Sequence, residues 1–280
     1  MADDPRIIPA RHDLAALHLR GEVEADAYAS GTEMQVAVPM APLTGAPDAD
    51  AEMTSQLLFG ETFTAYEIDG GWAWGQCAHD NYVGYVPEAN LMPAGPATTH
   101  RITALQALVF PEPRLKARPI GALPFGARVG MAEVEEGFAA LTVGGWVPAS
   151  QIAPDEDHAP MWVATAKRFL GAPYLWGGRS PAGFDCSGLI QTALHSAGIA
   201  CPRDSDQQMA ALGRDAPRAG LRRGDLVFWK GHVGVMTSPN LLLHANAHHM
   251  EVAEEPFETA AARIAESEYG EILSVRRITR

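Results

Sequence analysis

The sequence predicts an α+β fold in which two small β-barrels precede a mixed domain of helices and strands. Two observations carry this prediction. Residues 51–153 consist of short, aromatic-rich strands separated by turn residues, a pattern typical of small barrels. From Asp155 onward, helical periodicity alternates with apolar strands. The chain has 280 residues, 47% of them hydrophobic, which is enough apolar material for one to three cores.

The β-rich half divides into two similar modules, which we expect at residues 51–95 and 96–153. The first contains the hairpin signal Asp69–Gly71 and closes on the strand end Tyr85–Pro87, while the second closes on Trp146–Pro148. Two strands that end in the same aromatic-Val-Pro pattern indicate an internal repeat. One larger β domain is the alternative.

Residues 1–50 are predicted to form a helix and a linker rather than part of a module. An amphipathic helix is expected around His12–Leu19. Residues 31–50 contain several prolines, and proline cannot donate a hydrogen bond to a strand ladder. This composition favours an extended linker.

The second half, residues 154–280, is predicted to form the α+β domain. A helix capped by Asp157 is expected from about Ala159 to Leu170, and a second from Cys186 to about Ala197, where Gly198 ends it. The strands expected after them are Leu226–Trp229, Val233–Thr237, Leu241–His244, Met250–Ala253 and Ile272–Ile278.

The charge of the chain argues against two classes of partner. The net charge is −13 and the pI is about 5.1. No Lys/Arg-rich run is present, so nucleic acid and anionic membrane surfaces are poor partners. The N-terminus carries acids where a secretory signal needs basic residues. We therefore expect a cytoplasmic protein; the sequence does not indicate its oligomeric state.

The three cysteines, Cys77, Cys186 and Cys201, form neither a disulfide framework nor a zinc motif. Cys77 and Cys201 are expected to be structural. Cys186 falls at the start of a predicted helix, where unsatisfied backbone N–H groups favour a thiolate. This position makes Cys186 the candidate nucleophile.

A nucleophilic cysteine needs a base, and the base needs a group that orients it. His232 begins one apolar strand and His244 ends another, so an antiparallel pairing of these strands would make the two imidazoles neighbours. A metal site at His244, His248 and His249 is the alternative. We reject it because no cysteine or carboxylate at a familiar spacing completes a ligand set. No metal and no cofactor are expected.

Three segments of the second half closely resemble the NlpC/P60 family of papain-like cysteine peptidases. They are PYLWGGRSPAGFDCSGLIQ, GDLVFWKGHVGVMT and LLHANA, and the resemblance covers about residues 155–280. It implies the catalytic residues Cys186, His232 and His244, the last as the third polar residue of the triad. It also implies a papain-like fold for this domain.

The resemblance extends to the N-terminal half, because SH3-like barrels before an NlpC/P60 domain are similar to the γ-D-glutamyl-L-diamino acid endopeptidases. It implies hydrolysis of murein peptides between D-Glu and diaminopimelate or L-Lys, with a free N-terminal L-Ala required. Murein-derived peptide is thus the expected partner, and cell-wall peptide recycling the expected role.

The resemblance also implies a set of substrate-binding residues. The motif Asp80–Tyr85 points to Tyr82 and the segment Leu-Phe-Gly-Glu to Glu61, both for a free amine. The remaining members of the set surround the nucleophile or follow its helix: Asp185, Ser187, Asp204 and Ser205. Core packing is the alternative role for Tyr82, and helix capping is the alternative for Asp204 and Ser205.

Two other functions stay open at this point. One is a binding module that holds wall peptides with an inert papain-like domain. The other is a thiol acyltransferase or amidase that acts on a different substrate. The complete set Cys186, His232 and His244 argues against the first, and the fate of a thioester would separate the second from a peptidase.

Overall fold

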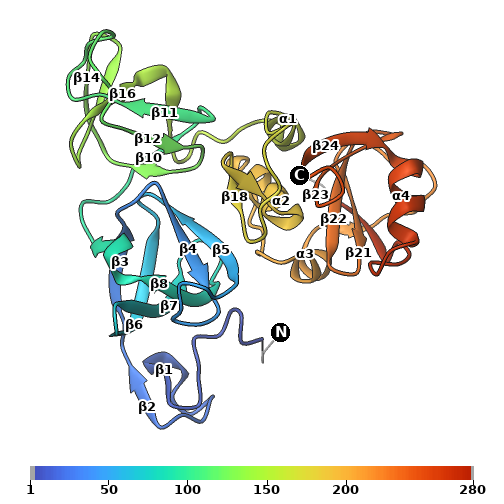
Figure 1. The fold of residues 1–280 in the computed structure, drawn as a ribbon, viewed down its shortest axis with the longest axis horizontal. Helices are drawn as coiled ribbons and strands as arrows, with labels where there is room; N and C mark the ends of the chain where they lie inside the picture. Colours follow the sequence, from blue (N-terminus) through green and yellow to red (C-terminus); the bar gives the residue numbers. More distant parts are fainter. Residues whose placement is uncertain (1–3, 279–280) are drawn as a thin grey trace. The chain divides into compact units, whose positions relative to one another are not determined.

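The computed structural model describes residues 4–278, which form two compact units that divide at Asp155 (Figure 1). The N-terminal unit is built from β-strands, and the C-terminal unit combines a sheet with helices. The α+β class predicted from the sequence is therefore confirmed. Each unit is described by itself below.

The first β-module of the N-terminal unit is a seven-stranded sheet with the order β5-β4-β8-β7-β6-β3-β9. All pairs are antiparallel. Its core is a cluster of buried side chains that includes Leu43, Phe63 and Val86. The strands are β3 (Thr32–Val36), β4 (Met40–Thr44), β5 (Met53–Leu58), β6 (Thr62–Asp69), β7 (Trp72–Cys77), β8 (Val83–Pro87) and β9 (Leu91–Pro93).

Two predictions for residues 1–50 are wrong. The expected helix around His12–Leu19 is a short strand, β1 (Leu14–Ala16), and a 3-10 turn, η1 (Leu17–Leu19); β1 pairs with β2 (Ala27–Ala29). The expected linker contains β3 and β4, so the first module begins near residue 32 and not at residue 51. The prolines fit the sheet because Pro39 lies between the two strands, and Pro42 lies where β4 pairs with β5 alone.

The second β-module, which contains residues 100–154, has three small antiparallel sheets around its own core. An isolated bridge between Phe110 and Trp146 connects two of the sheets. The strands are β10 (His100–Ile102), β11 (Gln106–Val109), β12 (Gly121–Pro124), β13 (Arg128–Val129), β14 (Met131–Glu135), β15 (Phe138–Leu141), β16 (Trp146–Pro148) and β17 (Ile152–Pro154). Within residues 4–278, the strand order of neither module closes on itself, so the barrel prediction is confirmed only for the all-β character.

The two modules end in the same local structure. Pro87 and Pro148 have nearly equal dihedral angles, φ −53° and ψ 125° against φ −56° and ψ 124°. Each proline is followed by a 3-10 turn, η2 (Glu88–Asn90) or η3 (Ala149–Gln151), and then by a short strand. The repeat signal in the sequence therefore corresponds to a repeated chain path.

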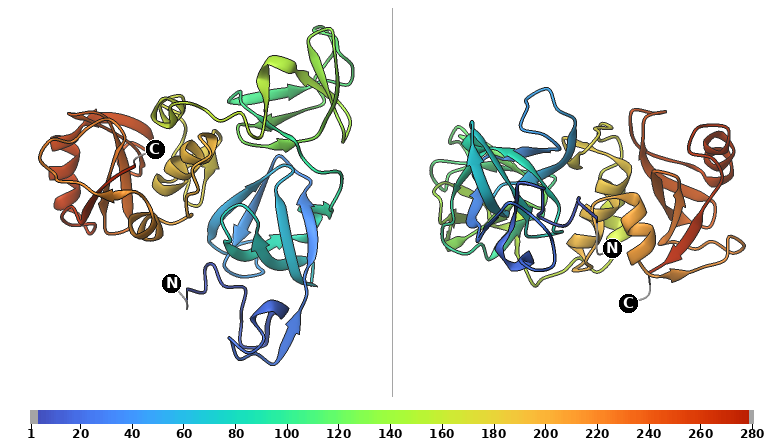
Figure 2. Two further views of the ribbon diagram at one scale, coloured as in Figure 1. Left: turned by 180° about the vertical axis from the view of Figure 1, so that it is seen from behind. Right: turned by 90° about the horizontal axis from the view of Figure 1, so that it is seen from below.

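The C-terminal unit contains a six-stranded sheet with the order β20-β25-β21-β22-β23-β24. Helix α2 (Cys186–Ser196) contacts β22 and β23, and α4 (Phe257–Ala265) contacts β23 and β24. Figures 1 and 2 show these helices on opposite sides of the sheet. The strands are β20 (Arg214–Asp215), β21 (Asp225–Trp229), β22 (His232–Ser238), β23 (Leu241–Asn246), β24 (Glu251–Pro256) and β25 (Ser274–Arg277).

All five strands predicted for this unit are present, and so is the helix that begins at Cys186. The other predicted helix is shorter than expected: α1 (Trp162–Lys167) begins after Met161 rather than at Ala159. The remaining elements are α3 (Ser205–Ala211) and the hairpin strands β18 (Arg179–Ser180) and β19 (Gly183–Phe184). Among the described residues, no helix is both long and apolar enough to cross a membrane.

Candidate active site

Cys186 is the first residue of α2, as the sequence predicts. Asp185 caps this helix, because its Oδ1 accepts the Gly188 N–H at 2.7 Å. The loop before the cap lies very close to the helix start. A Cβ added to Gly188 would lie 2.1 Å from the Gly178 carbonyl oxygen, so only glycine fits there. These contacts fix the cysteine at the point where the loop meets the helix.

A buried ion pair holds the loop around Cys186. The Asp185 carboxylate accepts from Arg203 Nη1 at 3.0 Å and from Arg203 Nη2 at 2.5 Å. Its Oδ2 also accepts the Gly177 N–H at 2.9 Å. Arg203 Nη1 also donates a hydrogen bond to Ser187 Oγ at 2.9 Å. Arg203 is only 1% exposed, so this pair is costly to break.

His232 and His244 lie side by side on the sheet. Strands β22 and β23 are antiparallel neighbours, as the sequence predicts, and His232 Nε2 lies 2.8 Å from His244 Nδ1. Both side chains are buried. Gly234, on β22, leaves room for them, since a Cβ there would lie 3.2 Å from His244 Cβ and 2.8 Å from Leu242 Cδ1.

No pattern in the sequence indicates the groups that follow His244. Its Nε2 lies 2.8 Å from Oε1 of Glu255, on β24. Arg263, on α4, donates to both oxygens of this carboxylate, at 2.8 and 2.6 Å. The pairing of β23 with β24 places Glu255 opposite Leu242, two residues from His244 and on the same face. Only the strand register shows this neighbour, so residue spacing could not have found it.

The thiol and the base face one cavity of 190 Å³. Cys186 Sγ lies 3.9 Å from the carbonyl oxygen of Gly231, the residue before His232. Tyr269 lies over His232, with ring centroids 5.8 Å apart. The other residues that line the cavity are Tyr174, Trp176, His244, Asn246, Ala247, His248, Arg263, Ile264 and Ser267.

The electrostatics of the site favour neutral groups at rest. Burial, followed by the negative charge of Asp185, raises the pKa of the Cys186 thiol to about 12. Burial also lowers the pKa of His232 to about 3, with a smaller contribution from His244. Burial thus acts against the preference for a thiolate that is expected at the helix start. A proton would have to pass from thiol to imidazole when a substrate is attacked.

The residues at the far end of the histidine pair keep a charge. Burial works to raise the pKa of Glu255, but hydrogen bonds from Arg263 and His244 outweigh it and hold the pKa well below its usual range. Burial lowers the pKa of His244, although its hydrogen bond to Glu255 acts in the opposite direction. The structure thus contains a neutral histidine pair that ends on a carboxylate.

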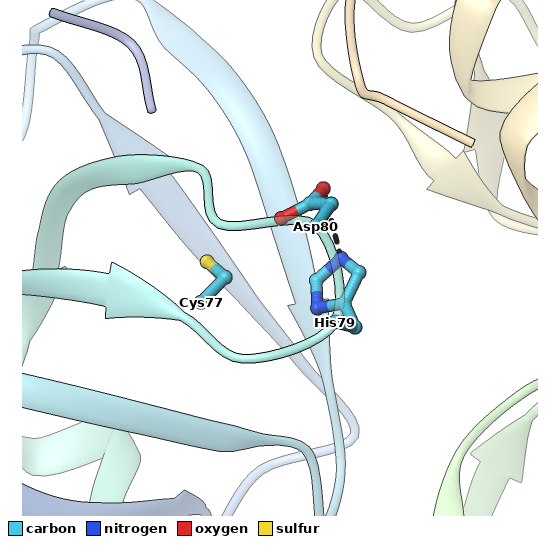
Figure 3. A group of neighbouring side chains, drawn as sticks. All are labelled: Cys77, His79 and Asp80. Carbon is cyan, nitrogen blue, oxygen red and sulfur yellow. Dashed lines mark ion pairs between the residues drawn. The ribbon is translucent and has the colours of Figure 1, made fainter. Parts of the chain in front are cut away.

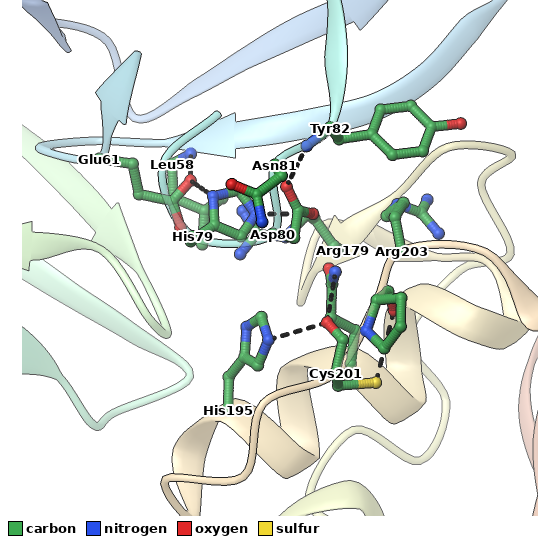
Figure 4. Close-up of polar contacts among 12 residues, drawn as sticks. Leu58, Glu61, His79, Asp80, Asn81, Tyr82, Arg179, His195, Cys201 and Arg203 are labelled. Atoms are coloured by element: carbon green, nitrogen blue, oxygen red, sulfur yellow. Dashed lines mark hydrogen bonds and ion pairs between the residues drawn. The ribbon is translucent and has the colours of Figure 1, made fainter. Parts of the chain in front are cut away.

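Two of the predicted substrate-binding residues lie in the N-terminal unit. Glu61 is 7% exposed, and its Oε2 accepts the Leu58 N–H at 2.8 Å. Tyr82 is 5% exposed and belongs to the core cluster of the first β-module. Its N–H donates to Asp80 Oδ1 at 3.0 Å (Figure 4). Core packing is thus one role that Tyr82 has in the structure, and its substrate role stays a prediction.

Asp204 and Ser205 lie at the start of α3. Asp204 is the N-cap and forms a capping box with Gln207, whose Oε1 accepts the Asp204 N–H at 3.4 Å. Cys201 lies before this turn, and its carbonyl oxygen is 3.1 Å from His195 Nε2 (Figure 4). Substrate contacts of Asp204 and Ser205 stay predictions.

Two groups in the described chain have residue types that could hold a metal ion. One consists of Cys77, His79 and Asp80 in the first β-module (Figure 3). The other consists of His244, His249 and Glu255. In the second group, Arg263 already neutralises the carboxylate that would bind the ion. The reason given from the sequence for rejecting a metal is therefore wrong, because Glu255 supplies a carboxylate that residue spacing does not reveal.

Two family models match the chain. Residues 171–265 match the model described as NlpC/P60 family, and residues 43–91 match the model described as bacterial dipeptidyl-peptidase Sh3 domain. The chain therefore contains an NlpC/P60 domain and a bacterial dipeptidyl-peptidase SH3 domain. Cys186, His232 and His244 all lie within the first match, which places the candidate site in a cysteine peptidase domain.

Curated relatives agree with this assignment. A probable endopeptidase of Mycobacterium tuberculosis is 38% identical over 101 residues, 35% of this chain and 26% of the relative. Dipeptidyl-peptidase 6 of Lysinibacillus sphaericus is 27% identical over 76% of this chain and 87% of the relative. Gamma-D-glutamyl-L-lysine dipeptidyl-peptidase of Bacillus subtilis is 38% identical over 35% of each protein. The chain spans about a quarter of the length of the mycobacterial relatives.

A solved structure has the same fold. The crystal structure of an NlpC/P60 family protein from Bacillus cereus has a TM-score of 0.75 and 21% identity, and the match covers 89% of this chain and 100% of the other. At this identity the similarity establishes the fold alone.

Proposed function

We propose that the protein is a cysteine peptidase that hydrolyses the bond between γ-D-glutamate and a diamino acid in peptidoglycan-derived peptides. The observation that carries the proposal is the arrangement of Cys186 at a capped helix start with the buried pair His232 and His244. The similarity to dipeptidyl-peptidase 6, which extends over most of both chains, supports the substrate class.

The chemistry follows from the neutral resting site. As Cys186 Sγ attacks the γ-glutamyl carbonyl, its proton passes to His232, and a tetrahedral oxyanion forms. The Cys186 N–H has no intrahelical acceptor at the first helical position, which makes it the first candidate donor to this oxyanion. His232 then protonates the diamino acid amine as the C–N bond breaks, leaving a thioester. Water, deprotonated by His232, hydrolyses the thioester and restores the thiol.

The cavity next to Cys186 suits a polar segment of the substrate. Burial raises the pKa of both Tyr174 and Tyr269, so their phenols stay protonated and can donate hydrogen bonds. Ser267 and His248 add polar atoms to the same lining. We propose that this cavity accepts one of the two residues that flank the scissile bond.

Three finer points belong to the same proposal. A requirement for a free N-terminal L-Ala amine, with ligands Glu61, Tyr82 and Asp185, is expected from the resemblance. The second β-module is a further SH3-like module, as its matching chain path after Pro148 suggests. The biological role is recycling of murein peptides in the cytoplasm, which cell fractionation with an antibody against the protein would check.

Peptide hydrolysis tests the proposal directly. The purified protein is incubated with L-Ala-γ-D-Glu-meso-diaminopimelate, with its L-Lys analogue and with the N-acetylated form of each, and products are identified by mass spectrometry. Release of the free diamino acid from the free-amine peptides alone is the expected result. Hydrolysis of the acetylated peptides as well would keep the peptidase and remove the amine requirement. Hydrolysis of none would contradict the proposed function.

A further inference from the structure

A continuous chain of hydrogen bonds runs from the catalytic base to a paired carboxylate. His232 Nε2 lies 2.8 Å from His244 Nδ1, and His244 Nε2 lies 2.8 Å from Glu255 Oε1. Arg263 closes the chain by donating to both Glu255 oxygens. His244 is 0% and Glu255 9% exposed, so water cannot readily replace these partners.

The carboxylate determines which nitrogen atoms carry protons. An ionised Glu255 can only accept, so His244 Nε2 must carry the proton that it donates. A neutral imidazole has one N–H, which leaves His244 Nδ1 as an acceptor for the Nε2–H of His232. The same rule then leaves Nδ1 of His232 without a proton. This nitrogen is the one able to take a proton from Cys186.

We propose that Glu255 is a positioning residue that fixes the tautomers of His244 and His232, so that His232 Nδ1 is the atom that accepts the Cys186 proton. The proposal rests on the peptidase function above. It adds a fourth side chain, outside the predicted triad, on which the protonation state of the base depends. Arg263 supports it by holding the carboxylate in a two-pronged pair.

The other charged and titratable neighbours are few in the described chain. His249 Nδ1 lies 3.8 Å from Glu255 Oε1, and Tyr269 and Cys186 face His232. None of them offers His244 Nε2 a second carboxylate. Arg263 donates to both oxygens of Glu255, so an amide at position 255 would lose one of these bonds in either orientation and could turn its NH₂ group toward His244 Nε2. That arrangement reverses both tautomers and puts a proton on His232 Nδ1.

The neighbouring residue supplies a matched control. Glu254 is also a glutamate on β24, but it points to the opposite face, where it accepts from Thr237 Oγ1 at 2.5 Å and from Lys167 Nζ at 3.1 Å. Glu254→Gln therefore removes the same charge from the same strand without touching the histidine pair.

The test compares Glu255→Gln, His244→Ala, the double variant and Glu254→Gln, each checked by thermal unfolding. Glu255→Gln is expected to lower kcat by roughly 10- to 100-fold with little change in KM, whereas Glu254→Gln stays within about twofold of the parent. Adding Glu255→Gln to His244→Ala is expected to cost nothing further, because Glu255 acts through His244. Losses that multiply in the double variant, or an unchanged kcat for Glu255→Gln, would overturn the proposal.

A second measurement does not depend on any substrate. Nitrogen-15 NMR of the histidine side chains in the parent protein is expected to show His232 protonated at Nε2 and bare at Nδ1, with the reversed form populated in Glu255→Gln. The opposite tautomer in the parent would refute the role of Glu255. If these spectra agree and no γ-glutamyl peptide is cleaved, the substrate assignment fails while the positioning role stands.

Discussion

The two units each contain a cluster of a cysteine, a histidine and a carboxylate, and the clusters differ in how their members are connected. In the first β-module, Cys77 ends β7 and is 1% exposed in the core, while His79 and Asp80 follow on the turn (Figure 3). His79 Nε2 pairs with Asp80 Oδ2 at 3.0 Å. In the C-terminal unit, Cys186 begins a helix and faces a cavity.

Residue types do not by themselves define a nucleophile. Cys77 is packed among apolar side chains of a strand, whereas Cys186 combines a helix start, a cavity and a base that is itself oriented by His244. The acid also differs: Asp80 is next to its histidine in the sequence, but Glu255 lies on another strand. Chemistry is expected only where access and orientation coincide.

The largest effect should come from exchanging one cysteine of each cluster for alanine. Cys186→Ala is expected to lower the rate of peptide hydrolysis by at least roughly 10⁴-fold, because the nucleophile is lost. Cys77→Ala should keep the rate and lower the free energy of unfolding by about 1–2 kcal/mol, since it leaves a small cavity in the core. Steady-state kinetics and urea unfolding check both; a Cys77 variant without activity would undo the distinction.

The next effect is a loss of stability, which we expect when the loop that holds Cys186 is disturbed. Asp185→Asn removes one charge from a buried pair, which leaves Arg203 uncompensated and should cost about 3–5 kcal/mol. The control is Asp215→Asn, because Asp215 is 86% exposed and its pair with Arg276 is worth under about 1 kcal/mol. Denaturant unfolding of the two variants checks this; equal losses would show that the Asp185 pair is not structural.

The pH dependence of thiol reactivity should also differ between Cys186 and Cys77. Since the pKa of the Cys186 thiol is raised to about 12 and that of His232 is lowered to about 3, the free enzyme holds a neutral pair at pH 7. The rate at which iodoacetamide alkylates Cys186 should rise about tenfold per pH unit between pH 7 and pH 10, while Cys77 stays unmodified in the folded protein. Mass spectrometry of the peptide that contains each cysteine follows the reaction. A plateau from pH 4 to pH 8 would indicate a resting thiolate–imidazolium pair instead.

A further expected effect concerns acid stability. In the folded state the pKa of His232 lies below its ordinary value near 6.5, so the unfolded chain binds more protons as the pH falls. The contribution of His232 to the free energy of unfolding should therefore decrease as the pH falls from about 6.5, and it should stop decreasing near pH 3. Thermal unfolding of His232→Asn, which lacks the titration, should show a shallower loss over that window than the parent; parallel curves would contradict it.

The sequence predicted the parts of the site that are encoded locally. Cys186 at a helix start and His232 and His244 on adjacent strands each have a signal in the surrounding residues. Glu255 and Arg263 have none, because their contact with His244 arises from the register of β23 with β24 and from the packing of α4. The effect of burial on the Cys186 pKa has no signal either, since burial is a property of the folded unit.

The fold followed the same division. The strands and the helix of the C-terminal unit were predictable from periodicity, whereas the prolines of residues 31–50 favoured a linker where β3 and β4 lie. Their apolar side chains, such as Val36 and Leu43, are fully buried in the module core. Proline lowers the chance of a strand only where its missing N–H would be needed.

The most direct test of the central claim is to look for the acyl group on Cys186 during turnover. The protein is mixed with L-Ala-γ-D-Glu-meso-diaminopimelate, stopped with acid within milliseconds and digested, and the peptide that contains Cys186 is weighed by mass spectrometry. We expect an added L-Ala-γ-D-Glu acyl group on Cys186 of the parent protein, and no such group on Cys77 or in the Cys186→Ala variant. Hydrolysis of the peptide by the Cys186→Ala variant, with no adduct on Cys186 in the parent, would contradict it.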